Sequence, residues 1–167
     1  VRMADGSKEK TAFQSDLGLH HWNVMPMGLK NAPATFQRLM DLVLRGLTPS
    51  QCLVYIDDII IFGSTFSQTL ENLRSVLTRL RDAGLKCKAK KCFLFQTTIE
   101  FLGHTVSKNM ICTSKKLTEA IIDFPHPQNL KDVERWLGMC GFYGKFIPHL
   151  AEIVAPMTAL KRKDVKF

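Results

Sequence analysis

Two adjacent carboxylates, Asp57 and Asp58, are the residues of this sequence best suited to chemistry. They lie between two short apolar runs, residues 52–56 and 59–62, which predict a β-hairpin that turns on the carboxylates. Adjacent carboxylates repel each other and resist desolvation, so they favour a positively charged partner. Mg²⁺ prefers oxygen ligands and commonly takes one or two carboxylates together with substrate phosphates. A pair of such ions stabilises the attacking and leaving oxygens of a phosphoryl transfer.

An Asp-Asp dipeptide is also an ordinary surface turn, and by itself it indicates no ligand. The apolar residues on both sides indicate instead a covered hairpin, in which solvated charge has no structural use. The flanking runs therefore favour a site for Mg²⁺, with Mn²⁺ as a possible substitute. Zinc is not expected, because the sequence has no Cys-x-x-Cys pair and its histidines fall at no ligand spacing.

The elements that position this turn are predicted from hydrophobic periodicity. Four segments show apolar residues at helical spacing: residues 34–47, 66–80, 117–124 and 130–140. Two further apolar runs predict strands, residues 92–95 and 99–106. Gly84 lies where the second helix would stop, and Asn129 can cap the fourth. The order predicts an α+β unit over residues 1–113, followed by a small helical unit over residues 114–167.

Composition and charge narrow the class of protein. An apolar content of 46% with 23% charged residues is typical of a soluble globular protein, and no run approaches the roughly 20 apolar residues of a membrane span. The net charge is +8, and much of the excess is clustered at Lys86, Lys88, Lys90, Lys91, Lys161, Arg162, Lys163 and Lys166. Such clusters suit a polyanion, although a solvated lysine-rich surface explains them equally well.

The five cysteines are scattered, odd in number and mostly inside apolar runs. This pattern predicts buried free thiols in a reducing, intracellular compartment. No targeting segment is visible in the polar residues around Met3. The aromatic residues Trp136, Phe142, Tyr143 and Phe146 could stack on bases, but their helical spacing is more typical of a core.

Five ordered blocks of this sequence strongly resemble the reverse transcriptases of gypsy-type LTR retrotransposons. They are Lys-Thr-Ala-Phe (10–13), Met-Pro-Met-Gly-Leu-Lys-Asn-Ala-Pro-Ala-Thr-Phe-Gln (25–37), Tyr-Ile-Asp-Asp (55–58), Phe-Leu-Gly-His (101–104) and Phe-Tyr-Gly-Lys-Phe-Ile-Pro (142–148). The resemblance implies a right-hand RNA-directed DNA polymerase from a Pol polyprotein, with palm and partial fingers in residues 1–113 and thumb in residues 114–167. It also implies Mg²⁺, an RNA or DNA primer-template and deoxynucleoside triphosphates as partners.

The resemblance assigns roles around the carboxylates. Asp57 and Asp58 would bind metal, with Asp57 the principal ligand, and Tyr55 would lie near the primer terminus. Residues 25–37 would line the nucleotide site and support the template, and the residues in contact would be Met27, Gly28 and Gln37. Gly28, which has no side chain, would allow the backbone to approach the substrate closely. The same block is also readily explained as a Pro/Gly turn that caps the following helix.

Further roles follow for later residues. Phe101, Leu102, Gly103 and His104 resemble the primer grip, a hairpin that holds the primer end, whereas the pattern alone favours a core strand interrupted by glycine. Lys91 is similar to the family lysine proposed to protonate the departing pyrophosphate. Lys86, Lys88 and Lys90 are equally suitable phosphate contacts.

The family pattern includes a third carboxylate, and an aromatic residue that excludes the ribose 2′-hydroxyl, on a strand before residues 10–13. Alignment places both before Val1, and Asp5 is a poor substitute in a polar, loop-like stretch. The resemblance therefore predicts that this chain alone has little or no polymerase activity. The alternative is a non-catalytic remnant of a domesticated or decayed retroelement that binds nucleic acid or protein.

Overall fold

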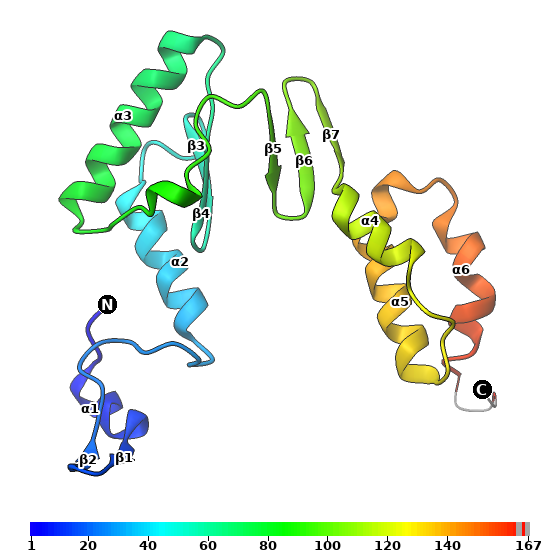
Figure 1. Ribbon diagram of the computed structural model, residues 1–167, viewed down its shortest axis with the longest axis horizontal. Coiled ribbons are helices and arrows are strands. Elements are labelled where there is room, and N and C mark those ends of the chain that lie inside the picture. The colour runs from blue at the N-terminus through cyan, green and yellow to red at the C-terminus, as the bar shows by residue number, and fades with distance from the viewer. Residues whose placement is uncertain (163–164, 166–167) are drawn as a thin grey trace. The chain divides into compact units, whose positions relative to one another are not determined.

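The computed structural model describes residues 1–162 and 165, which form two compact units, Val1–Cys92 and Phe93–Phe167. The first unit contains α1 (Asp5–Lys8), η1 (Glu9–Thr11), β1 (Phe13–Ser15), β2 (Gly18–His20), α2 (Ala32–Val43), β3 (Cys52–Tyr55), β4 (Asp58–Ile61), α3 (Phe66–Asp82) and η2 (Ala89–Lys91). Strands β1 and β2 form one antiparallel hairpin, and β3 and β4 form another. Helix α2 contacts β3 and α3 contacts β4, so both helices support the second hairpin (Figure 1).

The core of the first unit lies between α2, α3 and the β3–β4 hairpin. Its buried members are Met40, Leu44, Leu47, Cys52, Val76 and Leu80. The inner face of the hairpin completes it with Val54, Ile59 and Ile61. Burial of these apolar side chains fixes the register of the hairpin, because a slip by one residue would turn them toward solvent.

Helix α3 begins and ends at strong local signals. The Thr65 side chain accepts a hydrogen bond from the backbone N–H of Gln68 at 3.2 Å. At the other end Gly84 has φ +70°, and the N–H of Leu85 reaches the carbonyl of Leu80 at 2.9 Å. This is the Schellman pattern, so the predicted stop at Gly84 is confirmed.

The second unit combines a small sheet with helices. It contains β5 (Thr98–Phe101), β6 (His104–Ser107), β7 (Met110–Thr113), α4 (Lys115–Ile122), α5 (Leu130–Phe142), η3 (Gly144–Phe146) and α6 (Leu150–Ala159). The sheet is antiparallel in the order β5-β6-β7. Helix α5 contacts both α4 and α6 and is the centre of the helical part (Figure 1). No helix in the described residues is long and apolar enough to cross a membrane.

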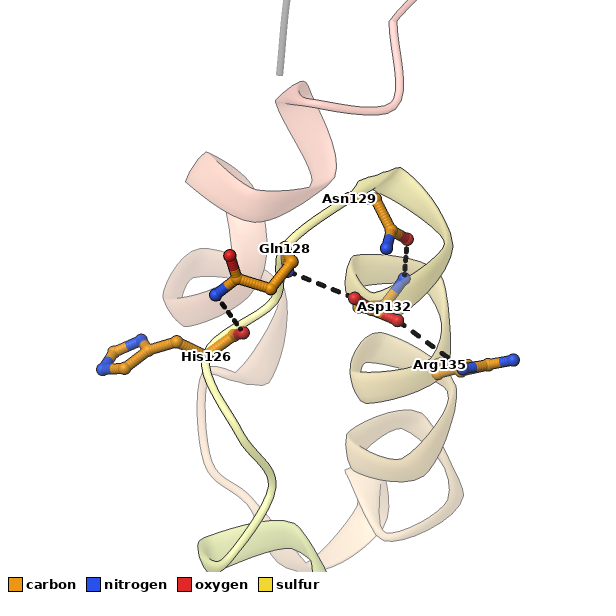
Figure 2. A network of polar contacts seen from close by, with 5 residues as sticks. All are labelled: His126, Gln128, Asn129, Asp132 and Arg135. Atoms are coloured by element: carbon orange, nitrogen blue, oxygen red, sulfur yellow. Dashed lines mark hydrogen bonds and ion pairs between the residues drawn. The ribbon is translucent and has the colours of Figure 1, made fainter.

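A polar network holds the start of α5 (Figure 2). The Asn129 side chain accepts from the N–H of Asp132 at 3.0 Å, so the predicted cap is confirmed. The Asp132 carboxylate in turn accepts from the N–H of Gln128 at 3.2 Å and lies 3.5 Å from Arg135. Gln128 also donates to the His126 carbonyl at 3.1 Å, which orders the chain before the helix.

Several predicted boundaries are wrong. The first long helix covers Ala32–Val43 and does not reach Leu47, since Gly46 adopts φ +83°. Residues 92–95 form no strand, because Phe95 has φ +52° and Phe93 is largely exposed. The predicted strand 99–106 is two strands, and β1, β2, β7 and α6 were not predicted. The compact units divide after Cys92, whereas the division into palm and thumb at residue 113 stays a prediction.

The cysteines divide into buried and exposed thiols. Cys52 and Cys140 are buried, but Cys87 and Cys92 are exposed, so the expectation of buried thiols is wrong for that pair. Burial raises the pKa of the Cys52 and Cys140 thiols, which lowers the fraction of reactive thiolate.

We therefore expect iodoacetamide to label Cys87 and Cys92 of the native chain first, and Cys52 and Cys140 only after denaturation. Mass spectrometry of timed digests measures the order. Equal labelling of Cys52 and Cys87 in the native chain would contradict the structure.

Candidate functional site

The β3–β4 hairpin carries the two carboxylates at its turn. Tyr55 pairs with Asp58, so Ile56 and Asp57 form a two-residue loop between the strands. Ile56 has φ +52° and Asp57 does not have a positive φ, which is the φ pattern of a type II′ turn. Glycine is the usual residue at the first position of such a turn, and a β-branched residue there is strained. The turn therefore needs support from the surrounding chain.

Gln37 of α2 supplies that support. Its Oε1 accepts a 2.6 Å hydrogen bond from the backbone N–H of Ile56. Its Nε2 donates to Asp41 Oδ1 at 2.9 Å and to the Val54 carbonyl at 3.4 Å. The amide of Gln37 is thus used inside the chain, where it fixes the conformation of the Asp57 loop.

Both aspartates are exposed, and within residues 1–162 and 165 neither carboxylate makes an ion pair or side-chain hydrogen bond. The expectation of a covered hairpin is wrong for one face. Val54 and Ile59 pack inward, whereas Leu53 and Tyr55 on the opposite face are 44% and 53% exposed. An apolar run on each strand does not reveal this difference, because β-branched residues also occupy half-covered hairpins.

The donor set of this turn fits a hard divalent cation. Asp57 and Asp58 offer only oxygen ligands, and no basic side chain in the described residues neutralises them. In the same described part, no three His, Cys, Asp or Glu side chains gather into a metal site. Two carboxylates with substrate phosphates match the ligands that Mg²⁺ commonly takes.

The remaining expected residues of the first unit lie in different settings. Tyr55 shares the open face of the hairpin with Asp58. Met27 is fully exposed, and Gly28 has φ +86° with no atom within 4 Å of an added Cβ. Glycine is therefore required at position 28 by its backbone conformation, while close approach of a ligand there stays a prediction.

The lysine cluster is a solvent-exposed stretch after α3. Lys86, Lys88, Lys90 and Lys91 are all exposed, and Lys90 and Lys91 belong to η2. Within the described residues, Lys91 makes no ion pair with either aspartate. Lys161 and Arg162 are also exposed, and Lys163 and Lys166 lie outside the described residues.

The expected primer-contacting segment of the second unit is a tight hairpin, as the resemblance implied. Phe101 pairs with His104, and the loop residues Leu102 and Gly103 have φ +49° and +76°. Two positive φ values are the pattern of a type I′ turn, which matches the twist of paired strands. A Cβ on Gly103 would lie 3.0 Å from Leu117 and 3.2 Å from Phe142. The backbone conformation thus favours glycine, and an added Cβ would also press on these two side chains.

The side chain of His104 points into the helical part of this unit. Its ring centroid lies 5.3 Å from Phe142, 5.7 Å from Tyr143 and 5.8 Å from Phe146. Nδ1 lies 2.9 Å from the Leu102 carbonyl, and the buried Nε2 has no hydrogen-bond partner among the residues that the structure describes. His104 therefore anchors the hairpin to the helical part of the unit. At the turn itself the exposed side chain is that of Leu102, which is 40% exposed.

The sequence interpretation missed two side chains with roles in these turns. Gln37 was assigned to nucleotide or template contact, and its clamp on Ile56 was not foreseen. Tyr143 was assigned to the core, yet its hydroxyl donates to the Gly103 carbonyl. The available signal was its phenol between Phe142 and Phe146, whose rings carry no polar atom, because a buried tyrosine hydroxyl needs a partner.

Residues 1–106 match the family described as reverse transcriptase (RNA-dependent DNA polymerase). The chain belongs to this family. The retrovirus-related Pol polyprotein from transposon 297 of Drosophila melanogaster is 42% identical over 166 residues, 99% of the chain and 16% of that relative. The Pol polyprotein from transposon opus of the same fly is 40% identical over 162 residues, 97% of the chain and 16% of that relative. The resemblance to retrotransposon reverse transcriptases is therefore confirmed.

Solved structures confirm the α+β fold of this reverse transcriptase family member. The foamy viral protease-reverse transcriptase in complex with double-stranded DNA matches with a TM-score of 0.86 and 28% identity, over 95% of the chain and 28% of that protein. The same viral protein with an RNA/DNA hybrid matches with a TM-score of 0.81 and 29% identity, over 95% of the chain and 21% of that protein. The chain thus spans about a sixth of its transposon relatives and about a quarter of these structures.

Proposed function

We propose that this chain contributes the metal-binding turn and a primer-contacting hairpin to a reverse transcriptase that extends a primer 3′ end by two-metal nucleotidyl transfer. The observation that carries the proposal is the Asp57–Asp58 turn. Its two exposed carboxylates have no counter-charge in the described residues, and a hydrogen-bonded glutamine holds the turn in a strained conformation. A surface turn without function gains nothing from this arrangement.

Asp57 and Asp58 would hold Mg²⁺, or Mn²⁺ in its place. When bound, such ions stabilise the charge on the attacking and leaving oxygens of phosphoryl transfer. Gln37 keeps the Asp57 loop in place, and Tyr55 lies beside Asp58 on the open face. Met27 and Gly28 would contact the incoming nucleotide or template strand. Lys91, together with Lys86, Lys88 and Lys90, would contact phosphates or pyrophosphate.

The substrates proposed are an RNA or DNA primer-template and deoxynucleoside triphosphates. The foamy viral relatives were solved with double-stranded DNA and with an RNA/DNA hybrid, which supports a duplex substrate for this chain as well. The net charge of +8 supports the same partner, because each phosphate neutralised by lysine or arginine releases condensed counterions. Affinity for an RNA/DNA duplex should therefore fall steeply as salt is raised.

A direct test is Mn²⁺ binding to the chain, measured by electron paramagnetic resonance or calorimetry. Asp57→Asn is expected to remove most of the binding, because each carboxylate supplies one of two protein charges at the turn. Asp16→Asn is the matched control, since Asp16 is exposed in another hairpin and the charge change is identical. Equal affinity of Asp57→Asn and the unaltered chain would reject the metal site.

Primer extension tests the competence of the chain. Two aspartates and substrate phosphates lack the third carboxylate of the family pattern, so we expect little or no incorporation by the chain on its own. Robust incorporation that Asp57→Asn abolishes would contradict this expectation while supporting the enzyme class. Duplex binding without any Mn²⁺ binding would favour the non-catalytic remnant.

A further inference from the structure

The hydroxyl of Tyr143 lies at the junction between the β5–β6 turn and helix α5. Tyr143 follows the last residue of α5 and is only 2% exposed. Its hydroxyl donates to the Gly103 carbonyl and accepts from the backbone N–H of Ser114 at 3.3 Å. The same N–H also lies 3.3 Å from the Gly103 carbonyl. One phenol thus joins the turn, the end of β7 and the end of α5.

Packing holds the Tyr143 ring in the orientation that this bond requires. The ring meets Phe142 edge-on at 4.9 Å and His104 edge-on at 5.7 Å, with Phe146 at 6.1 Å. Gly103 fits beneath Leu117 and Phe142 only because it lacks a Cβ. The turn therefore contacts the end of α5 in two ways, through the Gly103 carbonyl and through the ring of His104, the next residue.

One side of the turn is exposed to solvent, and the other side is buried against the rest of the unit. Leu102 is 40% exposed at the loop, whereas Ser114 and Tyr143 behind it are buried. The loop consists of Leu102 and Gly103, both with positive φ. The strand residues on either side of the loop pair with each other, but the peptide groups of the loop itself need other hydrogen-bond partners. The Gly103 carbonyl accepts from the Ser114 N–H and also from the hydroxyl of Tyr143, 40 residues later in the chain.

We propose that Tyr143 is a positioning residue for the primer 3′ end: its hydroxyl locks the Leu102–Gly103 turn to helix α5, so that both present one rigid surface to the primer. This inference rests on the proposed primer contact of residues 101–104. It differs from a purely structural role in one respect. Loss of the hydroxyl should affect recognition of a primer end more than affinity for duplex.

The test compares Tyr143→Phe with the unaltered 167-residue chain. Phenylalanine keeps the packed ring and removes the hydroxyl. Two probes of equal length are used, a DNA duplex with a recessed 3′ end and a blunt duplex, with affinity followed by fluorescence anisotropy. The unaltered chain is expected to prefer the recessed end. Tyr143→Phe should reduce that preference by about 2- to 10-fold, the range for one lost hydrogen bond, with little change for the blunt duplex.

Asn129→Ala is the matched control, because it removes a single 3.0 Å hydrogen bond at the opposite end of the same helix. It should lower thermal stability while leaving the end preference intact. Amide hydrogen exchange adds a readout that is independent of nucleic acid. Exchange of the Ser114 N–H should accelerate in Tyr143→Phe and stay unchanged in Asn129→Ala.

The outcomes separate the two proposals. An end preference that survives Tyr143→Phe overturns the positioning role and leaves the primer contact standing. Equal loss of preference in both variants assigns the effect to general destabilisation and also overturns it. An unaltered chain that binds both probes alike, or neither, rejects the primer contact itself, and the positioning role falls with it.

Discussion

Replacing Gln37 by methionine should weaken Mn²⁺ binding at the Asp57–Asp58 turn by about 10- to 100-fold, the range for residues that orient metal ligands. Methionine has nearly the length of glutamine but neither donates nor accepts a strong hydrogen bond. The N–H of Ile56 would lose its 2.6 Å partner, and the Val54 carbonyl and Asp41 would lose their donor. Ile56 would then leave its strained φ of +52°, and Asp57 would follow.

Gln68→Met is the matched control for this prediction. Gln68 lies on α3 and its Nε2 donates to the buried Asn72 at 3.1 Å, so the same substitution removes a side-chain hydrogen bond within that helix. Calorimetric titration with Mn²⁺ and thermal melting should be recorded for both variants. If Gln37→Met keeps the affinity of the unaltered chain, or if Gln68→Met loses as much, the clamp has no role in the metal site.

Features of this fold that depend on neighbouring residues could be predicted from the sequence. Gly84 ends α3 and Asn129 begins α5, as predicted, each through bonds that span a few positions. The Thr65 cap of α3 is equally local but was not predicted. The two-residue spacing between the runs at 52–56 and 59–62 likewise predicted the β3–β4 hairpin, although its loop is Ile56–Asp57 and not Asp57–Asp58. Local hydrogen-bond geometry and side-chain periodicity suffice for such features.

Features that depend on distant residues could not be predicted. Gln37 bonds to Ile56, 19 positions later in the sequence, and Tyr143 bonds to Gly103, 40 positions earlier. No local sequence pattern predicts either hydrogen bond. Residues 92–95 are mostly apolar and were predicted as a strand, yet they belong to none of the described sheets. Helix α6 was not predicted, and it contains Pro156, a residue type that disfavours a helix interior.

The candidate site shows the same division. Asp57 and Asp58 were singled out by type and spacing and Tyr55 by the family resemblance, and the structure places all three at one turn. Their exposure was not foreseen, since an apolar run does not say which face of a hairpin is covered. The resemblance improved on periodicity at residues 101–104, where it implied a hairpin and the pattern alone indicated one strand.

Leu44→Ala should destabilise the first unit by about 2 to 5 kcal/mol, the range for a leucine truncated in a close-packed core. Leu44 is fully buried and lies in one cluster with Met40, Cys52 and Val76. The cluster joins the end of α2 to the strand that leads into the metal turn. The loss therefore has two parts, the transfer free energy of the removed methyl groups and the cavity that the surrounding helices fill only in part.

Leu42→Ala provides the comparison, because Leu42 lies two positions earlier on α2 and is 57% exposed. Its loss should stay within about 0.5 kcal/mol, as for most surface changes. Urea unfolding followed by far-ultraviolet circular dichroism gives both values. Equal losses for the two leucines would mean that α2 does not bury the face seen here. A large loss confined to Leu44 would show that the first unit depends on the packing of α2 against β3, the same packing that brings Gln37 to the N–H of Ile56.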